Sequence, residues 1–221
     1  MGKVTFMFCT LVIEMAILWG YANAQEQVGF QNLCLGNEKT TRLQVFVQDE
    51  LGGENPTVWD VARSNITSTS PTSFGQVRVL DDLLTDGPDR NSKRVGRAQG
   101  LITSADLQVS ALAMNLNFVF TSGQYNGSTL CILGRNPLEN QYRELAIVGG
   151  TGVFRMARGY AITSTYSYDD ETSYGVLEYN IYVAYITSTY SYDVETSYGV
   201  LEYNIYVAYV DASNENMQSL N

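Results

Sequence analysis

The chain has 221 residues, a formal net charge of −10 and no histidine. The acidic surface that this charge implies disfavours nucleic acid and anionic membranes as partners. The lack of histidine excludes Ser-His-Asp and Cys-His nucleophilic catalysis and the usual zinc sites, so acid–base chemistry falls to other side chains. No Walker or dinucleotide-binding glycine pattern is present, and we expect neither a metal nor a cofactor.

The first 24 residues have the pattern of a secretory signal peptide. Lys3 precedes a largely apolar run over 4–19, and Ala22-Asn23-Ala24 has the small residues of a cleavage site. Glu14 interrupts the apolar run, which leaves a retained signal anchor as the alternative. We expect a secreted chain, with a flexible polar leader over residues 25–41.

Secretion affects how the cysteines and two asparagines are interpreted. Cys34 and Cys131 lie outside the signal, and two alternatives stay open for them: one disulfide, or two separate thiols. Asn65-Ile66-Thr67 and Asn126-Gly127-Ser128 are acceptor sequences for N-glycosylation. Asn126-Gly127 also predicts a tight hairpin turn.

Beyond the leader, short runs alternate between apolar and polar side chains and are separated by turn residues. Alternation with a period of two, rich in β-branched and aromatic residues, predicts half-buried strands. The turn residues cluster at 51–56, 65–71, 85–94 and 149–152. The runs predicted as strands are 42–48, 75–80, 96–103, 112–121, 129–133, 144–148, 157–168 and 176–185.

Near its end the chain contains two adjacent copies of one segment, residues 162–185 and 186–209. The copies differ only in Asp170 against Val194, and this near-identity indicates a recent tandem duplication or an error in the sequence. A solenoid array is disfavoured, because it needs three or more units. Two alternating runs flank a polar stretch in each copy, so each predicts a β-hairpin. We expect one copy to complete the fold and the other to be surplus, followed by a polar tail over 210–221.

About eight short strands without a strong amphipathic helix predict an all-β barrel or sandwich. An eight-stranded barrel can hold one small ligand. Asp49 and Asp81-Asp82 lie at predicted strand ends, where they would be either desolvated acids or turn-capping, solvated groups. Arg143 and Arg158 flank the glycine-rich turn at 149–152, and would hold a phenolate or carboxylate or pair with an acid of the protein.

Several motifs in this order resemble plant dirigent proteins. They are Gly75-Gln76-Val77 with Asp81-Asp82, VGRAQG at 95–100, GQYNGSTLCILG at 123–134 and IVGGTGVFRMARG at 147–159. The resemblance runs from about residue 42 to residue 185. It implies an eight-stranded antiparallel barrel of the allene oxide cyclase type, in a secreted, apoplastic, glycosylated protein that forms homodimers or homotrimers.

The resemblance implies a protein that binds phenoxy radicals, such as those of coniferyl alcohol, and directs the face on which two radicals couple to give optically active lignans. A separate laccase or peroxidase supplies the radicals, so no intrinsic oxidative activity is implied. Two alternatives remain. One is a dehydratase or cyclase acting through a quinone methide, as in pterocarpan formation; the other is a defence or cell-wall protein without catalytic activity.

Site residues also follow from the resemblance. Asp49 matches an aspartate that protonates the quinone methide, and Arg143 matches a pocket arginine. Asn136 stands where cyclising members have a second pocket aspartate, and an amide cannot give up a proton as a carboxylic acid does. Gln48 stands where many members have histidine. The expected substrate-binding residues are Asn136, Asp82 and Phe118.

Overall fold

The structure is a computed structural model that describes residues 37–187. The predicted signal peptide, Cys34, nearly all of the second repeat copy and the tail lie outside these residues. No helix in the described part is long and apolar enough to cross a membrane. The elements in chain order are β1 (Asn37–Glu50), β2 (Val58–Ala62), β3 (Val77–Thr85), β4 (Arg94–Ser104), β5 (Ala111–Phe120), η1 (Gly123–Tyr125), β6 (Thr129–Pro137), β7 (Arg143–Thr151), η2 (Gly152–Phe154), β8 (Arg158–Asp169) and β9 (Tyr174–Thr187).

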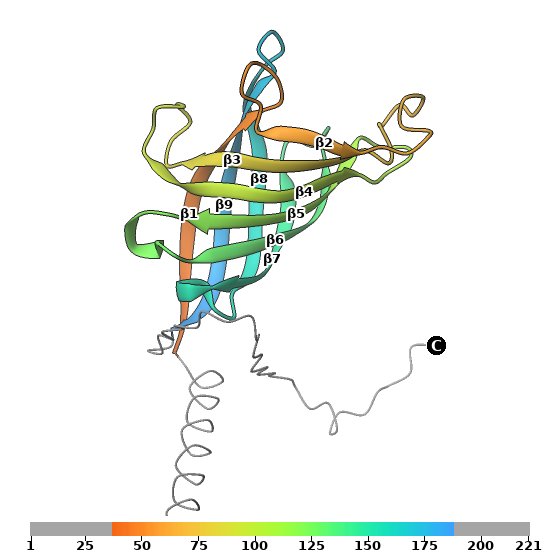
Figure 1. Cartoon of the computed structure of the whole chain (residues 1–221). Coiled ribbons are helices and arrows are strands. Elements are labelled where there is room, and N and C mark those ends of the chain that lie inside the picture. Colours follow the sequence, from red (N-terminus) through yellow and green to blue (C-terminus); the bar gives the residue numbers. More distant parts are fainter. Residues whose placement is uncertain (1–36, 188–221) are drawn as a thin grey trace, which may run out of the picture. The chain divides into compact units, whose positions relative to one another are not determined.

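Eight of these strands form a closed antiparallel barrel (Figure 1). Neighbouring strands follow the order β1-β9-β8-β7-β6-β5-β4-β3, and a short pairing of β1 with β3 closes the ring, from Phe46 opposite Thr85 to Gln48 opposite Leu83. Each of the eight runs predicted from the sequence overlaps one of these strands. The predicted eight-stranded barrel is therefore confirmed.

The ninth strand, β2, was not predicted, and it extends the sheet beyond the edge of β3. Only Val58 is buried in β2, and a register shift lies between Asp60 and Ala62, so the strand lacks the regular alternation that marks the others. Because β1 closes the barrel against the far end of β3, β2 lies outside the ring.

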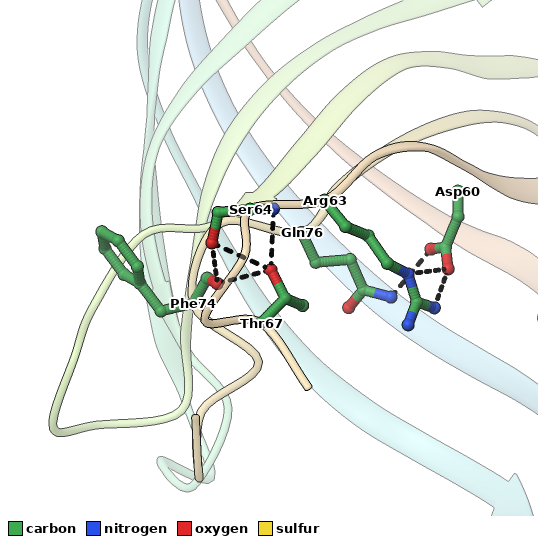
Figure 2. A network of polar contacts seen from close by, with 6 residues as sticks. All are labelled: Asp60, Arg63, Ser64, Thr67, Phe74 and Gln76. Carbon is green, nitrogen blue, oxygen red and sulfur yellow. Dashed lines mark hydrogen bonds and ion pairs between the residues drawn. The ribbon is translucent and has the colours of Figure 1, made fainter. Parts of the chain in front are cut away.

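The connection from β2 to β3 folds back on itself through a network of polar contacts (Figure 2). Asp60 accepts hydrogen bonds from Arg63 and from Gln76 Nε2, the second at 2.8 Å. Thr67 Oγ1 accepts from the Ser64 backbone N–H and donates to the Phe74 carbonyl, each at 2.9 Å. The polar groups of this connection, part of which was predicted only as a loop, thus form hydrogen bonds with neighbouring residues of the same segment.

The first repeat copy forms the β8–β9 hairpin, as predicted. The alternate residues Tyr179, Ile181, Val183 and Tyr185 of β9 are all buried, so this face of the alternating run faces the core. The opposite edge of β9 pairs with the whole of β1. β1 begins inside the predicted leader, since residues from Asn37 onwards pair with the end of β9 as far as Thr187.

The first copy completes the barrel, so removing the second copy should leave the fold intact. Deleting residues 186–209 brings Val210-Asp211 directly after Tyr185, replacing the last two residues of β9 by an equivalent apolar–polar pair. We expect the urea unfolding midpoint and the affinity for a phenolic ligand to match those of the full chain. A deletion variant that does not fold would show that both copies belong to the barrel.

Two turns differ from their predictions. At Asn126-Gly127, φ and ψ of −51° and 133° followed by a φ of 78° give a type II turn after η1, in place of a two-residue hairpin turn. In the run 149–152, the first two glycines belong to β7, and only Gly152 has a positive φ, of 61°. Gly150 lies so close to the backbone of Thr129 that no side chain fits there.

An aromatic cluster fills the barrel at the end where η1 and η2 lie. The Phe154 ring lies 5.5 Å from Phe120, 4.8 Å from Tyr125 and 5.3 Å from Tyr185, measured between ring centroids. Such tilted and edge-on contacts are favourable for aromatic rings. The pocket described below lies towards the other end of the barrel.

Replacing Phe154 by Ala should lower the free energy of unfolding by about 3–5 kcal/mol, because a fully buried ring is lost and a cavity remains. Urea denaturation measures this loss. Val153 in the same short helix is 37% exposed, so Val153→Ala is a matched control that should cost less than about 1 kcal/mol. A similar small loss in Phe154→Ala would contradict the role of the cluster.

Candidate functional site

A pocket of about 460 Å³ occupies the half of the barrel where β1 ends and β9 begins. This volume lies within the usual range for small-molecule sites. Most of the wall is apolar, and all eight strands of the barrel contribute residues to the lining. The apolar side chains are Val47, Leu51, Leu80, Ala98, Ile102, Leu112, Met114, Leu116, Leu138 and Leu177.

Four of the five predicted site residues lie in this pocket: Asp49, Asp82, Asn136 and Arg143. The fifth, Phe118, is fully buried but is not part of the pocket wall. Its ring packs edge-on against the Tyr179 ring, 5.0 Å between centroids, and so supports the pocket from within the core.

Gln48, predicted to affect the site chemistry, faces away from the pocket. Successive residues of a strand point to opposite faces, so Asp49 faces inward and Gln48 outward. Its amide is nonetheless buried: Nε2 donates to Thr85 Oγ1 at 2.8 Å, and Oε1 accepts from the Tyr174 hydroxyl. Gln48 therefore supports the β1–β3 seam.

Asp82 lies in the middle of β3, although the sequence placed it at a strand end. Its side chain points inward and is 1% exposed, whereas the neighbouring Asp81 points outward and pairs with Arg97. Thr57 donates a hydrogen bond to Asp82. Burial, with a smaller effect of the charge on Asp49, raises the pKa of Asp82 to about 8, so this carboxyl is mainly protonated at neutral pH.

Asp49 lies near the end of β1 and is the second carboxyl in the pocket. Burial raises its pKa to about 6, and the nearby charge of Arg78 partly opposes this rise. Its Oδ1 is buried without a hydrogen-bond partner. Asp49 and Asp82 interact and titrate as a pair, so near neutral pH the pair holds one proton and offers both an acid and a base.

Arg143 begins β7 and is 4% exposed. Nη1 and Nη2 each donate to Thr165 Oγ1 at 3.2 Å, and Nε has no partner. Burial lowers the pKa of the guanidinium, which still remains charged. Arg158, the other arginine considered, instead forms an ion pair with Glu38 and does not line this pocket.

Asn136 lies in β6 and is 5% exposed. Its Nδ2 makes only a weak contact of 3.7 Å with Met114 Sδ, and its Oδ1 is buried without a partner. In the strand order, β6 and β7 lie across the barrel from β1 and β3. The acid pair and the Asn136–Arg143 pair therefore occupy opposite walls.

The sequence interpretation missed four polar residues of the pocket: Arg78, Thr165, Tyr168 and Tyr179. Arg78 shares a strand face with Asp82, so a longer predicted strand would have revealed it. Tyr179 is buried, and burial raises the pKa of its hydroxyl to about 12. It stays neutral and serves as a hydrogen-bonding group.

The predicted modification sites lie on the outside of the barrel. Asn65 and Asn126 are both exposed in turns. Cys131 donates a hydrogen bond from Sγ to Asn117 Oδ1 at 3.3 Å. Its predicted disulfide partner, Cys34, is outside the described residues.

Fold and site together define a small-molecule-binding β-barrel with a pair of protonatable carboxyls in an apolar pocket. The profile of the family described as "Dirigent-like protein" matches residues 40–184. The chain therefore belongs to the dirigent protein family, which confirms the resemblance.

Relatives cover nearly the whole of the barrel. The chain is 43% identical over 175 residues to Dirigent protein 23 of Arabidopsis thaliana, covering 79% of this chain and 90% of that protein. It is 38% identical over 186 residues to Pterocarpan synthase 1 of Glycine max, covering 83% and 98%. The solved structure of the pterocarpan synthase dirigent protein GePTS1 has a TM-score of 0.65 and 42% identity, covering 69% of this chain and 93% of that one.

Proposed function

We propose that this dirigent protein binds phenolic substrates in the 460 Å³ pocket and directs the stereochemistry of phenoxy radical coupling. The observation that carries the proposal is an enclosed, mainly apolar pocket with polar groups on two opposite walls. Apolar walls hold aromatic rings, and the polar groups fix which way the rings face. A separate laccase or peroxidase supplies the radicals, such as those of coniferyl alcohol.

Orientation alone suffices for this role. Two phenoxy radicals couple rapidly in solution and from either face, which gives racemic products. Holding them in one geometry makes the coupling effectively unimolecular and selects one face. The coupled product is a quinone methide, and a protonated carboxyl of the Asp49–Asp82 pair is suitably placed in the same pocket to promote its ring closure.

The acid pair also favours a second candidate, a dehydratase or cyclase acting through a quinone methide. In this reaction a carboxylic acid donates a proton to a benzylic hydroxyl, which leaves as water while the phenol oxygen becomes a carbonyl and loses its proton to a base. An internal hydroxyl then adds to the quinone-methide carbon and loses its proton, while the carbonyl oxygen takes up a proton and the phenol is restored. The name of the Glycine max relative, a pterocarpan synthase, supports an isoflavanol as the substrate.

Two assays separate the candidates. In the first, coniferyl alcohol is oxidised by a one-electron oxidant with increasing amounts of the protein, and chiral chromatography measures the enantiomeric excess. In the second, an isoflavanol is incubated with the protein and no oxidant. An excess in the first assay supports radical coupling, and turnover in the second supports the dehydratase. Racemic product and no turnover would contradict both and leave a non-catalytic defence or cell-wall role.

The signal-like N-terminus supports secretion to the apoplast, and the exposed Asn65 and Asn126 support glycosylation there. A row of exposed apolar side chains on the outside of the barrel supports assembly into homodimers or homotrimers. Cross-strand pairing brings the row together from Trp59 to Val79 to Leu101, and Leu133 continues it on β6 beyond Asn115.

This row predicts that a charge at its centre weakens assembly. We expect Leu101→Glu to lower the mass measured by light scattering towards that of a monomer, because Leu101 is 42% exposed and an interface would desolvate the charge. Tyr142→Glu is the control, since Tyr142 is 65% exposed in the loop between β6 and β7, outside the row. An unchanged mass in Leu101→Glu would rule out this face as the interface.

A further inference from the structure

Two unpaired polar atoms in the pocket have complementary chemistry. Arg143 Nε carries a hydrogen and lacks an acceptor, while Asn136 Oδ1 is an acceptor and lacks a donor. Both side chains are at least nine-tenths buried and line the same pocket. An unsatisfied buried donor or acceptor is costly, and native proteins rarely retain such groups without a reason.

The strand register brings the two residues to the same part of the wall. β6 and β7 pair with Leu133 opposite Ala146. The β6–β7 pairing ends at these residues, and the same register continued by three residues would set Asn136 across from Arg143. The two residues do not satisfy each other, because each retains an unpaired atom.

We propose that Arg143 and Asn136 together bind the phenolic hydroxyl of the substrate in its protonated form. A hydroxyl is both a donor and an acceptor, so one such group satisfies both orphan atoms. The Arg143 Nε–H donates to the hydroxyl oxygen, and the hydroxyl donates to Asn136 Oδ1. This assignment rests on the proposed function: the hydroxyl is that of the phenol before its oxidation, or of the isoflavanol, because a phenoxy radical has lost this hydrogen. It fixes which end of the ligand faces β6 and β7.

Asn136 gives this site a property that an aspartate would not. A carboxylate beside Arg143 would pair with the guanidinium and occupy its free Nε. The amide is neutral, so among the described residues Arg143 has no carboxylate partner and its Nε stays open. The other titratable groups that line the pocket are Asp49, Arg78, Asp82, Tyr168 and Tyr179.

The opposite wall then receives the reacting part of the ligand. With the phenolic hydroxyl held at β6 and β7, the ring lies along the apolar wall, and its side chain points towards Asp49 and Asp82. In this orientation the acid pair contacts the carbon side chain, where quinone-methide chemistry takes place. The clamp therefore positions the intact phenol, and its hydrogen bond to Asn136 ends when the phenol oxygen loses its proton.

The test compares three small ligands that differ in their hydroxyl groups: guaiacol, veratrole and 3,4-dimethoxybenzyl alcohol. Guaiacol has a free phenolic hydroxyl, veratrole has a methyl group in its place, and the third has only a benzylic hydroxyl. Titration of the full chain by calorimetry or ligand-observed NMR should give an affinity for guaiacol that is about tenfold or more above that for each of the others.

Two variants assign the preference to its residues. Asn136→Leu keeps the side-chain size and removes the acceptor, so guaiacol should bind no better than veratrole. Asn117→Leu makes the same change on the exposed face of β5 and should retain the preference. A wild-type protein that binds all three ligands equally, or guaiacol and the benzylic alcohol equally, overturns the proposal without any variant.

The remaining outcomes are also decisive. If Asn136→Leu folds and retains the preference for guaiacol, the assigned role of Asn136 is wrong. If the wild-type protein binds none of the ligands, the proposed function itself fails, and this inference fails with it. Equal binding of all three ligands leaves the proposed function standing and overturns only the clamp.

Discussion

Replacing Asp49 by Asn is expected to slow ring closure or dehydration of a bound substrate by about 100- to 10,000-fold, the usual contribution of a positioned acid or base. Asp49 has a pKa of about 6 and an unpaired Oδ1 in the pocket. The amide keeps the shape of the side chain but cannot exchange a proton. The measurement is the rate of product formation in whichever of the two assays responds.

The pH dependence of the wild-type rate gives a second signature of the same pair. Below pH 6 both carboxyls are protonated, and above pH 8 both are ionised, since the pKa values are about 6 and about 8. A reaction that needs one acid and one base should therefore be fastest between these values. Asp81→Asn, on the outer face of β3, is the matched control and should leave rate and profile unchanged. A full rate in Asp49→Asn would exclude Asp49 as the acid or base.

The same two carboxyls should make the folded protein less stable as the pH rises from about 4 to about 8. Their pKa values in the folded state, about 6 and about 8, lie above the ordinary value of 3.8. Between these limits the folded state binds more protons than the unfolded state, so the free energy of unfolding falls as pH increases. Each pKa unit corresponds to about 1.4 kcal/mol, and the loss should reach several kcal/mol.

Urea denaturation at pH 4, 6 and 8 measures this loss. Asp82→Asn removes the carboxyl with the larger shift, so its stability should depend less on pH and exceed that of the wild type at pH 8. The pKa of Asp106 is shifted in the opposite direction, to about 2. Asp106 therefore changes the free energy of unfolding only below about pH 4, outside the tested range. A wild-type stability that is constant from pH 4 to 8 would contradict the buried positions of the pair.

The barrel could be predicted from the sequence because its strands alternate strictly. The alternate residues from Leu112 to Phe120 are all buried, and so is the matching face of β9. β2 was not predicted because only one of its residues is buried, so its sequence shows no periodic alternation. Closure through the β1–β3 seam depends on contacts between distant parts of the chain, which no local pattern encodes.

The site was predicted in part, and mainly through the family resemblance. From the sequence alone, Asp82 was placed at the end of a strand, since aspartate is rare inside strands. The structure shows why it is tolerated: its neighbour Thr57 donates to it, and its raised pKa allows it to be neutral. Phe118 was wrongly predicted to line the pocket. The alternation gave its inward direction correctly, but it could not give its depth along the barrel, which is below the pocket floor at Tyr179.

The repeat illustrates a different limit of local patterns. Both copies predict the same hairpin, and their sequences do not show which one pairs with β1. The structure assigns the first copy to β8 and β9, with β1 paired along the full length of β9. The described residues that line the pocket all lie between Val47 and Tyr179, before the second copy begins.

The central claim is that the pocket itself controls the stereochemistry of the product. Ala98 is fully buried and lines the pocket, so Ala98→Phe fills it, while Ala113→Phe places the same ring on the exposed face of β5. The enantiomeric excess of coupled coniferyl alcohol radicals is the direct measurement. We predict an excess with the wild type and with Ala113→Phe, and racemic product with a folded Ala98→Phe. An undiminished excess in Ala98→Phe would contradict the account.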